Sequence, residues 1–161
     1  MIIFGLSSLA LWSQLKFYIA PNTTVVSTPG LDIQIDGTLE INTSASYTHN
    51  GNTYLTGDWI NNLGWCSATS GTVNFHGGID QNITGIMGAE PYSSYFYNIV
   101  MDKDDNALML YVQLPTKAFN NVYCELGTFH VVTALDKLKV NKIIQNAAII
   151  ENFGTIEIGV P

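Results

Sequence analysis

Residues 61–77 read Asn61-Asn62-Leu63-Gly64-Trp65-Cys66-Ser67-Ala68-Thr69-Ser70-Gly71-Thr72-Val73-Asn74-Phe75-His76-Gly77. Two strand-like pieces are separated there by Asn-Leu-Gly and Ser-Gly turns. The second piece, a Gly-Thr pair followed by alternating apolar residues, is repeated at residues 37–41, 127–131 and 154–158. Apolar residues at every second position are typical of a half-buried β-strand. The chain is therefore predicted to be an array of short β-strands punctuated by glycine turns.

The predicted fold is all-β, a parallel β-solenoid. The first residues of successive Gly-Thr units lie 34, 56 and 27 residues apart, which is too uneven for a propeller but acceptable for a solenoid with insertions at its corners. An antiparallel β-sandwich whose turns recur is the alternative. The nearly continuous apolar run at residues 107–114 predicts one strand buried on both faces.

Composition predicts one folded domain without a nucleic-acid partner. The 161 residues are 47% hydrophobic and 12% charged, unlike a disordered segment. The net charge is −7, and all six basic residues are lysines. Binding to nucleic acid needs a dense cationic surface, and base recognition relies heavily on arginine.

The first residues predict export. Residues 1–13 have the length and apolarity of a signal peptide and are too short to span a membrane, although they contain no Lys or Arg. A buried first strand or helix is the alternative. Residues 14–161 then form a single β-repeat domain, which a fresh Gly-Thr unit near residue 154 suggests is truncated at its C-terminal end. The expected location is secreted or on the outer cell surface.

The two cysteines leave two interpretations open. Cys66 and Cys124 are compatible with one disulfide bond in an oxidising compartment. They are also compatible with two small buried apolar side chains, which is the favoured interpretation.

Calcium is the one cofactor that a short motif suggests. Asp102, Asp104 and Asn106 have the spacing of oxygen ligands that opens a calcium loop. Ala107 stands where such a loop has glycine, and Gln113 stands where it has a bidentate glutamate, so a solvated acidic turn is the alternative. The three histidines, His49, His76 and His130, have no zinc-like spacing. His76 and His130 fall at or beside variable positions of Gly-Thr units, which alternate to the outer face.

Three tyrosines are candidate ligand contacts. Tyr92, Tyr95 and Tyr97 could form a platform for sugar rings. Strand alternation places Tyr95 and Tyr97 on one side and Phe96 on the other. The alternative is that Phe96 is core and the tyrosines only cover an edge. No convergent pair of carboxylates and no nucleophile elbow is visible, so no catalytic residue is assigned and an enzyme is not expected.

One family resemblance rests on the same residues. The pattern Asn-x-x-Gly-aromatic, five residues, then Gly-Thr-Val-x-Phe-x-Gly, followed by residues 81–85 and 96–101, resembles the glycine- and asparagine-rich β-strand repeats of exported Bacteroidetes surface proteins. Those proteins are adhesin-like cargo of the type IX secretion system. The resemblance covers residues 35–101 well and 127–159 loosely. It implies a structural, cell-surface role and supplies no catalytic residues.

Together these observations predict a non-catalytic, secreted or cell-surface, adhesin-like β-repeat module. Surface glycans, other proteins and neighbouring repeats or domains of a longer chain are the expected partners, and no transmembrane helix is expected. The alternative is a carbohydrate-binding or carbohydrate-cleaving β-helix module of an exported protein.

Overall fold

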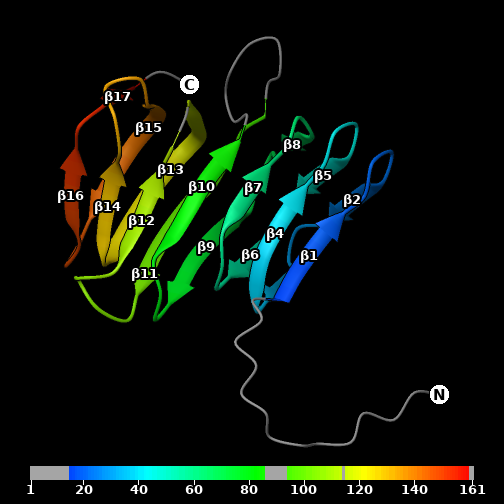
Figure 1. Ribbon diagram of the computed structural model, residues 1–161, viewed down its shortest axis with the longest axis horizontal. Coiled ribbons are helices and arrows are strands. Elements are labelled where there is room, and N and C mark those ends of the chain that lie inside the picture. The colour runs from blue at the N-terminus through cyan, green and yellow to red at the C-terminus, as the bar shows by residue number, and fades with distance from the viewer. Residues whose placement is uncertain (1–14, 86–93, 114, 160–161) are drawn as a thin grey trace, which may run out of the picture.

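The computed structural model describes residues 15–85, 94–113 and 115–159, and within these ranges the chain forms strands and turns without a helix. Figure 1 shows the strands stacked side by side along one axis. They form a parallel β-solenoid of about 6 turns. The predicted fold is confirmed, and the sandwich alternative is wrong. The predicted signal peptide lies outside the described residues.

Three parallel sheets form the walls of the solenoid. Sheet A contains β1 (Leu15–Ile19), β4 (Gly37–Ile41), β7 (Trp59–Asn61), β10 (Gln81–Gly85), β12 (Met109–Val112), β14 (Thr128–Val131) and β16 (Ile149–Asn152). Sheet B contains β2 (Thr24–Ser27), β5 (Ser46–His49) and β8 (Trp65–Ser67). Sheet C contains β3 (Asp32–Ile35), β6 (Asn52–Leu55), β9 (Thr72–Gly77), β11 (Asn98–Lys103), β13 (Thr116–Leu126), β15 (Lys137–Gln145) and β17 (Thr155–Ile158).

The cross-section changes after the third coil. Sheet B ends at β8, and its place is taken by residues 94–97, where the Tyr95 amide donates to the Cys66 carbonyl at 2.9 Å. Phe96 then bridges in parallel to Ala118 in the first half of β13. A register shift between Ala118 and Asn121 bends β13, so one long strand covers two sides of the coil. The later coils therefore keep three sides, two of which are formed by the two halves of one bent strand.

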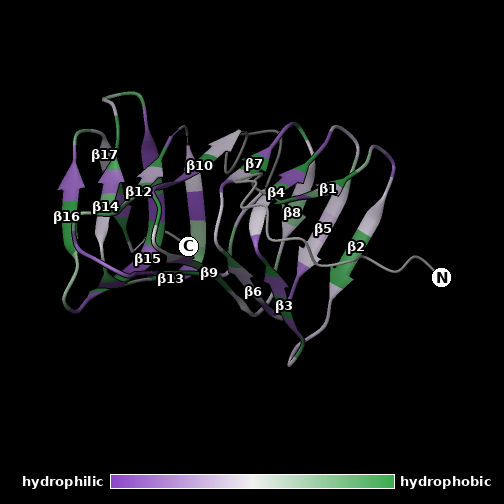
Figure 2. Ribbon diagram, turned by 60° about the horizontal axis from the view of Figure 1, so that its bottom comes forward, coloured by the Kyte–Doolittle hydropathy of each residue, from purple (hydrophilic) through white to green (hydrophobic). Residues whose placement is uncertain are grey.

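Parallel, in-register pairing stacks equivalent side chains in columns inside the solenoid. One column in sheet A contains Phe17, Leu39, Trp59, Ile83, Val112 and Val131. One column in sheet C contains Ile35, Leu55, Phe75, Met101 and Cys124. Apart from Phe17 on the first strand, these side chains are buried. Figure 2 shows hydrophobic and hydrophilic residues along the same strands, as expected when alternate side chains face the interior.

The prediction of a strand buried on both faces at residues 107–114 is wrong. In β12, Leu110 and Val112 are buried, whereas Met109 and Tyr111 are only half-buried. The reason is that each wall of the solenoid has solvent on its outer side. Consequently, even an apolar strand buries only alternate side chains.

The Gly-Thr units do not occupy equivalent positions in the coil. Those at Gly37 and Gly127 lead into strands of sheet A, whereas those at Gly71 and Gly154 lead into strands of sheet C. Gly71 precedes β9, which is aligned through β11 with the second half of β13, whereas Gly154 precedes β17, which is aligned through β15 with the first half. The uneven spacing of the four units therefore compares three different corners. Strand pairing shows the actual repeat, since Leu39 pairs with Trp59, 20 residues further on. The largest insertion lies before β12 and includes residues outside the described ranges.

Candidate functional site

A shallow pocket of about 150 Å³ lies where sheet B ends, lined by Ala68, Thr69, Tyr95, Tyr97 and Phe119. Ala68 and Thr69 directly follow β8, and the two tyrosines precede β11. Phe119 lies at the bend of β13. The pocket therefore combines three stretches of sequence that the solenoid brings together at one corner.

Backbone hydrogen bonds between residues 95–97 and 117–119 hold the aromatic residues of the pocket next to one another. The Phe96 amide donates to the Lys117 carbonyl at 2.9 Å, and the Phe119 amide donates to the Phe96 carbonyl at 2.7 Å. Between the two tyrosines, Phe96 points inward, is fully buried and packs edge-on against Trp59 with ring centroids 4.7 Å apart. Strand alternation therefore directs Tyr95 and Tyr97 outward, as the sequence indicates.

Phe119 completes an array of three rings. Its centroid lies 6.2 Å from that of Tyr97 with an interplanar angle of 21°, and 6.0 Å from that of Tyr95 with an angle of 39°. Phe119 is 44% exposed, although it is apolar. Phe119 points outward by the same alternation, because it follows the buried Ala118. Sequence reasoning missed Phe119, because only the pairing of Phe96 with Ala118 brings it beside the two tyrosines.

Lys117 adds a positive charge beside these rings. Its Nζ lies 5.9 Å from the Tyr95 centroid and 5.8 Å from the Phe119 centroid, which is within the range of a cation–π interaction. It makes no ion pair with a carboxylate of the described residues. Four other lysines have polar partners: Lys16 with Glu40, Lys137 and Lys139 with Glu157, and buried Lys103 with the Ile79 carbonyl and Gln81.

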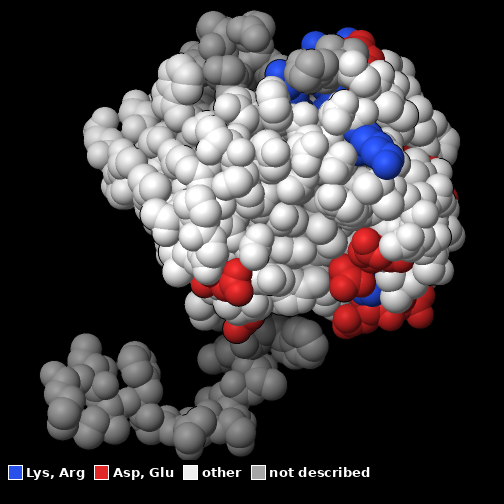
Figure 3. Space-filling model, turned by 180° about the vertical axis from the view of Figure 1, so that it is seen from behind, with Lys and Arg blue, Asp and Glu red and all other residues white. Residues whose placement is uncertain are grey.

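Charged groups are sparse over much of the molecule. Figure 3 shows the side opposite to that of Figure 1, where most atoms belong to uncharged residues and carboxylates gather near the lower margin. Among the described residues, the Lys117 ammonium lies beside aromatic rings and makes no ion pair with a carboxylate.

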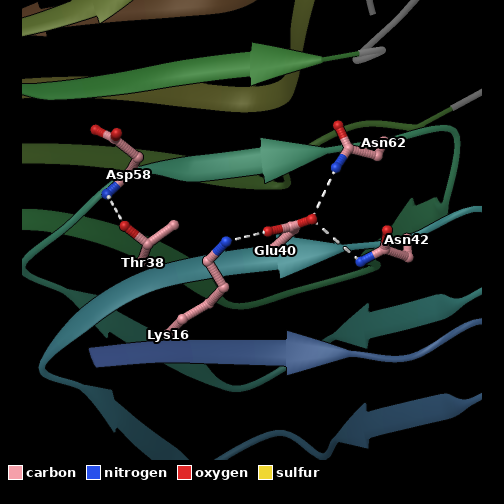
Figure 4. Close-up of polar contacts among 6 residues, drawn as sticks. All are labelled: Lys16, Thr38, Glu40, Asn42, Asp58 and Asn62. Atoms are coloured by element: carbon pink, nitrogen blue, oxygen red, sulfur yellow. Dashed lines mark hydrogen bonds and ion pairs between the residues drawn. The ribbon is translucent and has the colours of Figure 1, made fainter. Parts of the chain in front are cut away.

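The outer face of sheet A carries a polar ladder rather than a pocket (Figure 4). Glu40 accepts hydrogen bonds from Lys16 at 2.6 Å, from Asn62 at 2.9 Å and from Asn42 at 3.3 Å. The Lys16 ammonium, with help from the two amides, lowers the pKa of the Glu40 carboxyl below its usual value. These contacts connect three successive coils, so they hold the coils in register.

The remaining candidates are dispersed. Tyr92 lies outside the described residues. Asp102 and Asp104 are exposed, while the Asn106 Oδ1 accepts a hydrogen bond from the Gly127 amide at 3.0 Å. Asn106 thus supports the start of the next coil in this structure. Calcium binding at this turn stays a prediction.

The histidines divide into two surface residues and one core residue. His76 and His130 are half-buried, and the His130 Nδ1 lies 2.9 Å from the Glu151 carboxylate. His49 is fully buried between the rings of Tyr47, Trp59 and Phe96. Burial lowers the pKa of His49 to about 4. Its inward direction follows from alternation in β5, where Tyr47 and His49 are buried and Ser46 and Thr48 are half-buried.

Both cysteines are buried, free thiols in different walls. Cys66 stacks on Tyr47 in sheet B, whereas Cys124 stacks on Met101 in sheet C. Burial raises the pKa of the Cys66 thiol well above its usual value and that of Cys124 to about 12. The structure does not bring the two together.

Native protein is therefore expected to react negligibly with a thiol reagent near pH 8, because thiolate is the reactive form and both sulfurs are buried. After denaturation without reductant, both thiols should react. Ellman titration before and after adding denaturant measures this. Fewer than two thiols in the unreduced, denatured sample would contradict the structure.

No protein-family model matches this chain, and no curated protein or solved structure is significantly similar to it. The class that the fold defines is a parallel β-solenoid. Within the described ranges, no helix is long and apolar enough to cross a membrane.

Proposed function

We propose that this chain is a non-catalytic, adhesin-like module of a secreted or cell-surface protein, and that it binds surface glycans through the aromatic pocket at residues 68–69, 95–97 and 119. The observation that carries the proposal is the array of three outward rings held on the solenoid wall. The likeness to exported Bacteroidetes β-strand repeats supports the proposed location.

The solenoid is suited to be a stiff support. Every strand of sheet A pairs in parallel with its neighbours, and the buried columns run from Leu39 to Val131 in sheet A and from Ile35 to Cys124 in sheet C. The polar ladder on sheet A adds side-chain contacts between coils, as does the hydrogen bond from Asn52 to Asp32 on sheet C. A ring fixed to such a wall loses little conformational freedom when a ligand binds.

The pocket has the chemistry of a sugar contact. Aromatic rings give large, rigid apolar surfaces, and tyrosine adds a hydroxyl that can stay hydrated or bond to a ligand. The pyranose ring has an apolar face of C–H groups that packs against such a surface. The shallow pocket, with Phe119 partly exposed, leaves room for a chain to continue on either side of one bound ring.

A spacer between domains or repeats is the second candidate function. Large apolar side chains are exposed at both ends of the described solenoid, including Leu15 at 67% and Val26 at 55% on the first coil. Phe153 at 63% and Ile158 at 60% are exposed on the last. Uncovered strand edges of this kind pair readily with further β-structure.

A glycan array followed by titration tests the proposed function. Replacing Tyr95 and Tyr97 together by alanine should weaken binding of any captured glycan by about tenfold or more, because each lost ring contact contributes about 1 kcal/mol. Tyr54→Ala is the matched control, since Tyr54 is a half-buried tyrosine on sheet C away from the pocket. Equal losses in both variants, or no captured glycan, would count against the proposal.

A further inference from the structure

We propose that the aromatic pocket selects pyranose rings that carry an anionic substituent, a carboxylate or a sulfate, which the Lys117 ammonium binds. This inference rests on the proposed function, because it assumes that the pocket accepts a sugar. It adds which class of sugar the pocket prefers and which residue decides the preference.

The ring array determines how a sugar would lie. Tyr97 and Phe119 are almost parallel, at 21°, and their centroids are 6.2 Å apart, so they present neighbouring surfaces of similar orientation. Tyr95 is tilted by 39° from Phe119 and forms a side wall. A flat, ring-sized ligand fits this arrangement better than an extended apolar chain does.

Lys117 is fixed at the rim of the same array. Lys117 and Phe119 are two residues apart in β13, and residues two apart in a strand project to the same side. The Lys117 carbonyl accepts the Phe96 amide, which anchors the backbone of this lysine to the wall. Its ammonium lies just under 6 Å from both the Tyr95 and the Phe119 ring. An anionic group on a sugar stacked against Phe119 is therefore within reach of the ammonium.

Charge complementarity favours an anionic ligand over a neutral one. Lys117 makes no carboxylate contact with the described residues, whereas Lys16, Lys137 and Lys139 each pair with a glutamate. An ammonium with only ring contacts gains a charge-assisted hydrogen bond when an anion arrives. The net charge of −7 opposes this weakly, because exposed charges beyond about 8–10 Å are screened at physiological salt.

The experiment compares three oligosaccharides of similar size on the full chain by isothermal titration calorimetry: an oligogalacturonate, a sulfated galactan oligomer and a neutral galactan oligomer. The variants are Lys117→Gln, Phe119→Ala and, as matched control, Lys142→Gln, an exposed lysine away from the pocket. Circular dichroism melts check that each variant is folded.

We expect the anionic oligomers to bind about tenfold more tightly than the neutral one, with an advantage that shrinks as salt is added. Lys117→Gln should remove most of that advantage, because it should weaken binding of the anionic oligomers far more than binding of the neutral one. Phe119→Ala should weaken all binding, and Lys142→Gln should change nothing. The two anionic arms show whether carboxylate or sulfate is the better substituent.

Two outcomes overturn the inference and are distinguishable from each other. If neutral and anionic oligomers bind equally, or if Lys142→Gln lowers anionic binding as much as Lys117→Gln does, the selectivity is absent while the proposed sugar site stands. If none of the oligomers binds the folded wild-type chain, both the selectivity and the proposed glycan-binding function fail.

Discussion

Gly71→Ala is expected to destabilise the solenoid by about 3 kcal/mol or more, a large part of the stability of a domain of this size. Gly71 has a φ of +86°, and a Cβ atom there would lie 2.2 Å from the Gly51 carbonyl oxygen. The left-handed conformation costs a non-glycine residue about 1–2 kcal/mol. Displacing the backbone of the adjacent coil costs about 1–3 kcal/mol more.

Two neighbouring glycines separate these contributions. Gly77 has a φ of +96°, but its nearest contacts would be side-chain atoms at 3.8 Å, so Gly77→Ala tests the backbone conformation alone. Gly57 lies outside the left-handed region, but a Cβ there would lie 2.5 Å from the Gly37 carbonyl carbon, so Gly57→Ala tests the close approach alone. Urea unfolding of the three variants should give the largest loss for Gly71→Ala. Equal losses of unfolding free energy for Gly71→Ala and Gly77→Ala would contradict this prediction, because they would show that the close approach of Gly71 to Gly51 adds no destabilisation.

Comparison of Gly71 with Gly37 explains why the strands and the fold class could be predicted from the sequence while the length of the coil repeat could not. Alternating apolar residues after Gly71 identify β9 as a strand with one buried face. The same Gly-Thr pair occurs at Gly37, however, because close coil approach creates the same steric demand at another corner. Recurrence of the Gly-Thr pair therefore marks corners where two coils lie close together. Only strand pairing, such as that of Leu39 with Trp59, reveals the number of residues in one coil.

The part of the candidate site that lies on one strand could be predicted from the alternation of inward and outward side chains. Tyr95 and Tyr97 alternate with buried Phe96, so their outward direction follows from the strand pattern. Phe119 and Lys117 join them only because the first half of β13 pairs with residues 94–97, a contact between segments some 20 residues apart that local pattern does not encode.

Acid should destabilise this protein through His49. The Nε2 of His49 lies 3.3 Å from the Tyr95 carbonyl oxygen, which can only accept, so in the neutral ring Nε2 carries the proton. Its Nδ1 is buried without a hydrogen-bond partner among the described residues, and its neighbours are the rings of Tyr47, Trp59 and Phe96. A proton added at Nδ1 would create a charged imidazolium in an apolar core.

The direction of the pH dependence follows from linkage. The folded-state pKa of His49 is lowered to about 4, against a usual value of 6.5, so the unfolded chain binds more protons between these values. The stability that depends on neutral His49 is therefore fully present above about pH 6.5 and is lost as the pH falls toward 4. Between about pH 7.5 and pH 5, where carboxylates still contribute little, this one group should lower the free energy of unfolding by about 2 kcal/mol.

Urea unfolding at these two pH values, on wild type and on His49→Leu, measures this contribution as the difference between the two losses. His49→Leu loses the contact with the Tyr95 carbonyl and is expected to be less stable than wild type at neutral pH. Its stability should nevertheless fall much less on acidification. His76→Gln, which alters a half-buried histidine on the outer side of β9, should retain the wild-type loss. An equal acid-induced loss in wild type and His49→Leu would mean that the core accommodates the imidazolium, and that His49 does not limit the acid stability of the solenoid.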